Sequence, residues 1–190
     1  MKYKKLHHVA KRIDHLIDHH LRKSRSAFPP QEDLKKIVES HFPDYFVENC
    51  GWHKIVFGNR QIAQVVLKVG NRKSIEGDHR TYKRVPHEVQ HRLFARIFWH
   101  TKYCLLQEYG SPVQVSPEEL EVIRQEAYKY GIVDVKANNL RRIEGGIKIV
   151  DANLSPIPLP AVLRKLDEIK AKLPEWLTLL LKKLTKIIND

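Results

Sequence analysis

The sequence predicts an α+β fold, with short β-strands near its middle and amphipathic helices around them. Residues 45–69 and 103–110 contain short runs rich in β-branched and aromatic residues. Residues 1–26 and 160–189 carry apolar residues at helical spacing. The chain has 190 residues, 42% of them hydrophobic, which suffices for one domain with a real core.

The first predicted element is a basic amphipathic helix over residues 1–26, which we expect to form an appended segment of residues 1–28. Lys and Arg crowd its polar face. His15 and His19 stand one turn apart, beside Asp14 and Asp18, so the spacing fits either a metal site or an ordinary solvated face. Pro29-Pro30 should end this segment, and a short helix over 31–40 should follow. The apolar face of the first helix consists of Leu6, Val9, Ile13, Leu16, Ile17 and Leu21.

The formal net charge of +12 indicates an affinity for negatively charged partners. A polyanion or an acidic protein could dock on the basic first helix, but a generally solubilising surface explains the charge equally well. The two cysteines, the charged N-terminus and the absence of an apolar run of about 20 residues predict a cytoplasmic protein without a transmembrane segment.

Three strands are expected next, over "YFVEN", "HKIVFG" and "QIAQVVLKV", with a turn at Cys50-Gly51-Trp52 between the first two. The polar stretch 70–84 reads as a loop. The run "VPHEVQHRLFARIFWH" (85–100) reads as a helix with Val89, Leu93 and Ile97 on one face. "KYCLLQEYG" is a fourth strand that ends at Gly110.

A helix should begin at Ser116, because Ser116, Pro117 and Glu119 form a capping-box pattern, and it should end at Gly131. A β-hairpin then follows around Gly145-Gly146. Two leucine-rich helices, about 160–173 and 175–189, complete the predicted order of elements.

The open end of this hairpin carries the polar residues of most interest. A three-residue turn at 144–146 pairs Ile143 with Ile147 and places Asn139 opposite Asp151. Opposed residues lie about 5 Å apart at Cβ, so an amide oxygen and a carboxylate would converge as hard ligands of the kind that Mg²⁺ takes. A two-residue turn would shift this register by one.

Two more charged residues precede the hairpin. Asp134 lies on the loop leading in, where it could meet a substrate hydroxyl, and Lys136 offers a positive charge to a phosphate. An ordinary exposed hairpin with polar ends accounts for this stretch equally well.

Several short motifs, in order over residues 45–153, resemble those of the protein-kinase-like family. "DVKANNL" (134–140) resembles the catalytic loop D-x-K-x-x-N-L, and "IVDAN" (149–153) resembles the segment with the metal-binding Asp of D-F-G. "VVLK" (65–68) is similar to the V-A-I-K strand, and "LLQEYG" (105–110) stands where the hinge between the lobes would be. The resemblance implies an antiparallel-sheet N-lobe with hinge over 29–110, followed by a small helical C-lobe over 111–190.

The resemblance also implies roles for residues at the chemical centre. Asp134 would orient or deprotonate the acceptor hydroxyl, and Lys136 would neutralise the γ-phosphate. Asn139 and Asp151 would hold Mg²⁺, and Lys68 would bind the α- and β-phosphates of ATP.

Further residues of an ATP site follow from the same comparison. Glu88 would form an ion pair with Lys68, although Glu88 could instead pair with Arg92 one turn on. Glu76 is a rival partner for Lys68. Taken alone, Lys68 could also be a solvated strand end. The remaining ATP contacts would come from Gly51 and Lys54 near the phosphates, and from Gln107, Glu108 and Tyr109 at the hinge.

The sequence departs from the family pattern in four places. No G-x-G-x-x-G precedes the second strand, Ile132-Val133 replaces His-Arg, Ala152-Asn153 replaces Phe-Gly, and residues 152–190 contain no A-P-E. We therefore expect a minimal, atypical kinase with a truncated C-terminal lobe, acting on a protein or small-molecule hydroxyl. The alternative is a pseudokinase-like nucleotide-binding or basic interaction module without phosphotransfer.

Overall fold

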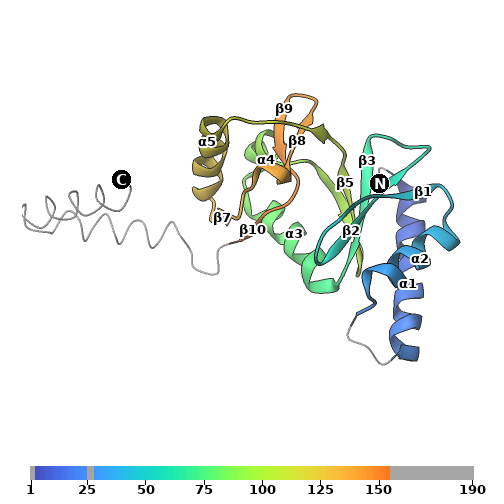
Figure 1. The fold of residues 1–190 in the computed structure, drawn as a ribbon. Helices are drawn as coiled ribbons and strands as arrows, with labels where there is room; N and C mark the ends of the chain where they lie inside the picture. Colours follow the sequence, from blue (N-terminus) through green and yellow to red (C-terminus); the bar gives the residue numbers. More distant parts are fainter. Residues whose placement is uncertain (1–2, 25–27, 155–190) are drawn as a thin grey trace, which may run out of the picture.

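The computed structural model describes residues 3–24 and 28–154, which form an α+β fold around an antiparallel sheet (Figure 1). The helices are α1 (Lys4–Ser24), α2 (Gln31–His41), α3 (Arg72–Arg84), α4 (His87–Leu93), α5 (Pro117–Tyr128) and the short 3-10 helix η1 (Ala137–Asn139). The strands are β1 (Tyr45–Cys50), β2 (Lys54–Asn59), β3 (Val65–Gly70), β4 (Ile97–His100), β5 (Cys104–Glu108), β6 (Ser111–Pro112), β7 (Ile132–Val133), β8 (Leu140–Ile143), β9 (Gly146–Ile149) and β10 (Asn153–Leu154).

The main sheet has five strands in the order β1-β2-β3-β5-β4, with every neighbouring pair antiparallel. β3 is the central strand and is buried along its whole length. Its continuous apolar run, broken by Lys68, is typical of a strand covered on both faces. The expected strands over 45–69 and 103–110 are thus confirmed.

One face of the sheet packs against α1 and α2 (Figure 1). Ala10, Ile13 and Ile17 of α1 are fully buried and share one hydrophobic cluster with Phe57 and Leu67 of the sheet. Burying each Ile side chain stabilises the fold by roughly 1.5–3 kcal/mol. The helix expected as an appendage over residues 1–28 therefore belongs to the core of the sheet.

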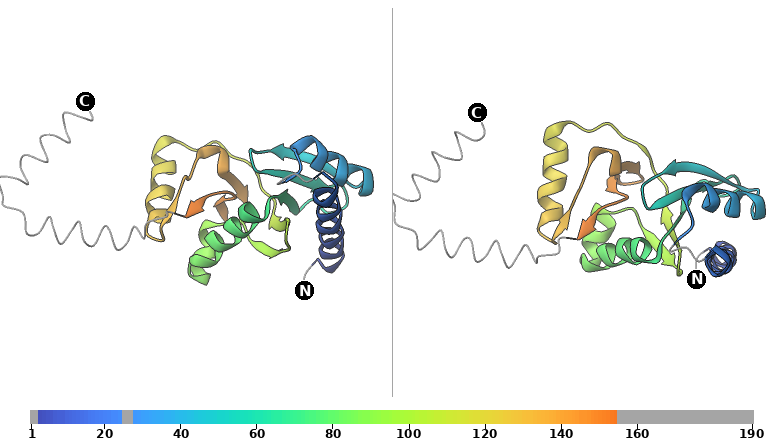
Figure 2. Two further views of the ribbon diagram at one scale, coloured as in Figure 1. Left: turned by 90° about the horizontal axis from the view of Figure 1, so that it is seen from below. Right: turned by 60° about the horizontal axis from the view of Figure 1, so that its bottom comes forward.

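α3 crosses the opposite face of the sheet and leads to a second hydrophobic cluster (Figure 2). This cluster joins α4 and α5 to the β8–β9 hairpin through fully buried Leu140 and Ile149. The Ala95 N–H donates to the Ile149 carbonyl at 3.0 Å, so backbone hydrogen bonding also ties the segment after α4 to the hairpin.

Two expected elements are wrong. Residues 72–84 form a helix rather than a loop, because Asn71 caps it by accepting from the Ser74 N–H and Ile75 anchors its buried face. The helix expected over 85–100 ends at Leu93, and Ile97–His100 form β4 instead. The long-range pairing of β4 with β5 overrides the helical spacing of its apolar residues.

The hairpin forms with a register one residue away from the three-residue turn. Ile143 pairs with Gly146, and Leu140 with Ile149, so the loop is the two residues Glu144-Gly145. Gly145 has φ +88°, a conformation that glycine adopts at no steric cost and that two-residue hairpin turns require.

The helix that was expected at Ser116 is confirmed as α5, with both hydrogen bonds of the capping box present. The two leucine-rich helices expected over 160–173 and 175–189 lie outside the described residues. Among the helices that the structure describes, none is long and apolar enough to cross a membrane.

Candidate functional site

The candidate site lies on the face of the sheet opposite α1. Side chains alternate between faces along a strand, so Lys54 and Val56 of β2 share this face with Val66 and Lys68 of β3. Val56 stands directly opposite Lys68 in the register. Two lysines and two valines therefore line the floor between the sheet and the hairpin half of the molecule.

Asp78 of α3 forms ion pairs with both lysines. The Lys54 Nζ lies 2.7 Å from Oδ1 and 2.8 Å from Oδ2 of Asp78, and the Lys68 Nζ lies 3.4 Å from Oδ2. Lys54 also donates to Asp151 at 3.1 Å, and Lys68 donates to the Val150 carbonyl at 2.6 Å. Residues from β2, β3, α3 and the end of the hairpin thus meet in one network.

The network is buried at its floor and open at its rim. The side chains of Lys68 and Asp78 are 5% and 10% exposed, whereas the side chain of Asp151 is 39% exposed. Burial alone would raise the pKa of Asp151, but Lys68 and Lys54 outweigh it and hold this pKa below its usual value. Asp151 is therefore an ionised, partly exposed carboxylate at the edge of a network whose buried part contains the cations of Lys54 and Lys68.

Lys54 carries the complementary effect. Burial alone would lower its pKa, but Asp78 and then Asp151 raise it above the usual value. Lys54 is therefore a fixed positive charge between the two carboxylates.

Asp134 and Lys136 form a second, more exposed ion pair, with Asp134 Oδ1 and Lys136 Nζ 2.8 Å apart. Asp134 has φ +62°, in the left-handed region that Asp and Asn adopt more readily than other non-glycine residues. Lys136 also contributes to lowering the pKa of Asp151, which places the two groups in one electrostatic neighbourhood.

The backbone of Asn139 faces Val150 rather than Asp151, because of the one-residue change in register. The Val150 N–H donates to the Asn139 carbonyl at 2.9 Å. Asn139 and Asp151 still lie at the same end of the hairpin, but not as the directly opposed pair that a three-residue turn predicts.

The expected partner of Lys68 is wrong. Glu88 lies exposed at the start of α4, beyond Pro86, whereas Lys68 contacts Asp78. The rival Glu76 pairs with Arg72 at 2.7 Å. Asp78 takes this place because residues 72–84 fold as a helix whose buried face runs through Ile75, Asp78 and Tyr82.

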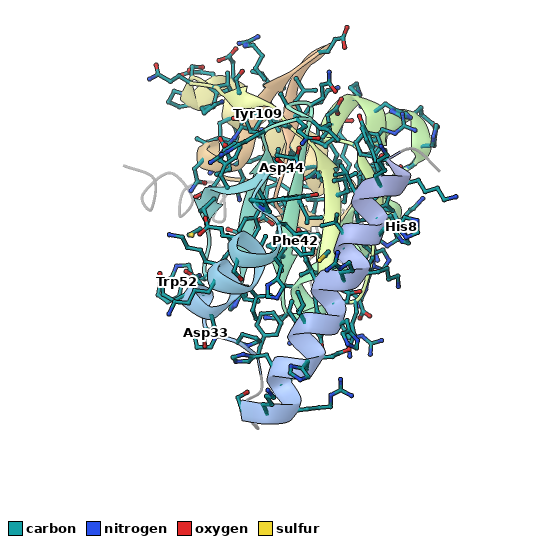
Figure 3. All side chains as sticks on the ribbon, turned by 90° about the vertical axis from the view of Figure 1, so that its right-hand side faces the viewer. His8, Asp33, Phe42, Asp44, Trp52 and Tyr109 are labelled. Carbon is teal, nitrogen blue, oxygen red and sulfur yellow. The ribbon has the colours of Figure 1, made fainter. Side chains whose placement is uncertain are left out.

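The turn between β1 and β2 is short. Its Gly51 N–H donates to the Lys54 carbonyl at 2.9 Å and closes the hairpin around Trp52-His53. Trp52 is 95% exposed at the tip (Figure 3). The turn therefore supplies one glycine next to Lys54, rather than a glycine-rich cradle.

The three residues expected at the hinge lie where β5 ends, and their polar groups are largely engaged. The Glu108 N–H donates to the Arg96 carbonyl at 2.8 Å, and the Tyr109 N–H to Gln64 at 2.9 Å. Gln107 is buried, and its Oε1 has no partner among the described residues.

The segment that follows β5 also packs closely on the hairpin at Gly110. A Cβ at this position would lie 2.4 Å from Ile143 Cγ1 and 2.8 Å from the Arg142 carbonyl oxygen. A glycine is needed here for the connection to run against β8.

The histidine and aspartate positions of α1 form no metal cluster. Asp14 faces inward and accepts hydrogen bonds from the turn before β5, while His15 and His19 are exposed on the outer face. Across residues 3–24 and 28–154, no group of three His, Cys, Asp or Glu side chains is arranged to hold a metal ion.

Comparison of the sequence with protein-family models and with curated proteins gives no match. Sequence reasoning missed Asp78, although the spacing of Ile75, Asp78 and Tyr82 marks one face of a helix. It also missed that Val56 and Val66 lie on the same face of the sheet as the two lysines, which becomes visible only once the strand register is known.

Proposed function

We propose that this chain is an atypical ATP- and Mg²⁺-dependent kinase with a protein-kinase-like fold. It would transfer the γ-phosphate of ATP to a hydroxyl group of a protein or small molecule in the cytoplasm. One observation carries the proposal: Lys68 of the sheet, Asp78 of α3 and Asp151 after the hairpin converge, although they are far apart in the sequence. Phosphoryl transfer depends mainly on such positioned charges.

The two lysines suit the phosphates of ATP. Lys68 is fixed by Asp78 and the Val150 carbonyl, so its ammonium group is oriented before any ligand arrives. Lys54 supplies a second cation close to the short β1–β2 turn, where a glycine-rich cradle would otherwise supply N–H groups. Val56 and Val66 offer an apolar floor for the base on the same face.

The donor chemistry around Asp151 fits Mg²⁺. Asp151 is ionised and partly exposed, and Asn139 brings an amide oxygen to the same end of the hairpin. Oxygen ligands of this kind are the ones that Mg²⁺ shares with phosphates, where it neutralises developing negative charge. Asp151 would have to exchange its contact with Lys54 for that role, which frees Lys54 for a phosphate.

Asp134 and Lys136 suit the acceptor side. Asp134 is exposed enough to accept a hydrogen bond from an incoming hydroxyl, and Lys136 stands ready to neutralise the transferred phosphate. The ion pair with Lys136 at 2.8 Å restrains the Asp134 carboxylate.

The second candidate is a nucleotide-binding or interaction module without phosphotransfer. The contact between Lys54 and Asp151 favours it, because this ion pair satisfies Asp151 without a metal. The engaged N–H groups of Glu108 and Tyr109 also leave fewer donors for a base.

A titration with ATP, with and without Mg²⁺, tests binding by the rise in Tm. The wild type is expected to show a larger rise with Mg²⁺ than without it, and Asp151→Asn should lose this difference. Asp33→Asn is a matched control, since it removes a carboxylate from α2 and should leave the response unchanged. A wild type that does not respond to Mg-ATP, or an Asp151→Asn variant that responds fully, would contradict the proposed site.

Transfer of the γ-phosphate separates the two candidates. Radiolabelled ATP should yield labelled protein, labelled acceptor or free phosphate with the wild type. Asp134→Asn should lose this turnover by about 10²-fold or more and still bind Mg-ATP. Binding without turnover in the wild type, across protein and small-molecule acceptors, would favour the binding module.

A further inference from the structure

The outer face of α1 carries a stripe of Lys, Arg and His side chains. Six exposed residues recur every three or four positions, so they fall on one side of the helix. A second exposed row runs beside them, formed by Lys5, Arg12 and Lys23. We name these two rows together the α1 stripe, and its first row consists of Lys4, His8, Lys11, His15, His19 and Arg22.

The acids of α1 are turned away from this stripe or already neutralised. Asp14 is buried and accepts hydrogen bonds from the Thr101 hydroxyl at 3.0 Å and the Tyr103 N–H at 2.9 Å. Asp18, at the edge, pairs with Lys102 at 2.7 Å. The helix is therefore anchored to the sheet by its acids and presents its cations outward.

The α1 stripe is long, straight and hollowed near its middle. A helix of 21 residues is about 31 Å long, close to the roughly 34 Å of one duplex turn. An open hollow of about 430 Å³ is lined by His8, Lys11, Arg12, His15 and Leu16. His8 points outward from α1, away from Phe42 (Figure 3).

The residues on and beneath the α1 stripe favour some classes of anionic partner over others. A membrane-bound amphipathic helix inserts its apolar face, but here Ile13 and Ile17 are committed to the core of the sheet. Single-stranded nucleic acid is usually bound on aromatic platforms, and the stripe contains no Phe, Tyr or Trp. An acidic protein would be expected to bury several apolar anchors, whereas Leu16 is the one apolar residue among the described residues that line the hollow.

We propose that the α1 stripe binds the phosphate backbone of double-stranded nucleic acid. The contact would be independent of base sequence, because Lys and Arg side chains on a rigid helix reach phosphates without entering a groove. The overall formal charge of +12 strengthens the long-range attraction. This proposal does not depend on kinase activity.

Fluorescence anisotropy with the full chain and a labelled duplex of roughly 20 base pairs, about two helical turns, tests the proposal. Six phosphate contacts, one for each Lys and Arg of the stripe, predict a loss of about 10³-fold in affinity between about 50 and 200 mM salt. The triple variant Lys4→Gln/Lys11→Gln/Arg22→Gln should bind more weakly, with a salt slope reduced by about 3. All three side chains are exposed, so the variant should fold normally.

A second triple variant separates the position of the charges from their number. Lys73→Gln/Arg80→Gln/Lys83→Gln also removes two Lys and one Arg, from exposed positions on α3. It should keep most of the affinity and the full salt slope. Equal losses in the two variants, or no binding of a DNA or RNA duplex by the wild type, would overturn the proposal. So would tighter binding to single strands, to polyglutamate or to phosphatidylserine vesicles than to the duplex.

Discussion

Asp78→Asn is the sharpest test of the network beneath the candidate site. The substitution keeps the size of the side chain but removes the negative charge between Lys54 and Lys68. The side chains of Lys54 and Lys68 are only 13% and 5% exposed, so water can replace little of the lost carboxylate. Breaking a buried pair by removing one partner costs about 3–5 kcal/mol.

This loss should appear as a fall in the free energy of unfolding, measured by urea denaturation followed by circular dichroism. The midpoint should fall while the slope m stays constant, since the surface exposed on unfolding hardly changes. In a chain of this size, the same loss corresponds to a fall in Tm of roughly 6–20 °C.

Two further variants make the result specific. Asp134→Asn removes a carboxylate from an exposed pair and should cost at most about 1 kcal/mol. Adding Lys54→Met to Asp78→Asn removes one of the two buried cations that have lost Asp78, and it should restore part of the stability. A cost for Asp78→Asn no larger than that of Asp134→Asn would refute the reasoning, because the network would then be solvated.

Other substitutions test the anchoring of α1, the charge state of Asp151 and the backbone of two glycines. Asp14→Ala should lower the free energy of unfolding by about 3 kcal/mol in urea denaturation, because it leaves the buried donors around Asp14 without their acceptor. Asp151 has a lowered pKa in the folded state, so its contribution to stability is present above the unfolded pKa of 3.8 and is lost as the pH falls through the folded pKa. The difference in the free energy of unfolding between wild type and Asp151→Asn should therefore shrink in urea titrations from about pH 7 to about pH 3. Gly145→Ala should cost about 1–2 kcal/mol by thermal unfolding because φ is +88°. Gly77→Ala, in α3 with open space around the added Cβ, should instead raise stability by roughly 0.5–1 kcal/mol.

Local patterns predicted the elements whose stability is local. The capping box of α5 and the β-rich runs of β1, β2 and β3 have signals within a few residues, and the structure confirms them. The strand β4 has no such signal, because Ile97 continues the helical spacing of Leu93 and only its partner β5 makes it a strand. The hairpin register depends on one residue of turn length, which the sequence "EGG" leaves open.

The candidate site was predictable in its residue types and less so in its pairings. Lys68 and Asp151, which the motif comparison singles out, belong to one network of ion pairs and hydrogen bonds in the structure. The partner of Lys68 depends on which residue of α3 faces the sheet. Residues 72–84 contain few apolar residues and include Gly77, so the sequence did not predict this helix. Asp78 was therefore reachable only by first assigning the helix.

The network also bears on why two lysines face the inside of a sheet at all. Apolar residues of similar volume at Lys54, Lys68 and Asp78 would avoid the cost of burying charge, and such replacements are often neutral or stabilising. The arrangement is thus a poor way to gain stability, although removing one member alone is costly. Its cations are fixed at the floor and its one partly exposed carboxylate, Asp151, faces outward. That asymmetry fits the proposed site, in which the buried lysines would bind phosphates and Asp151 would bind the metal. In the proposed site, the partial exposure of Asp151 would leave its carboxylate accessible to Mg²⁺.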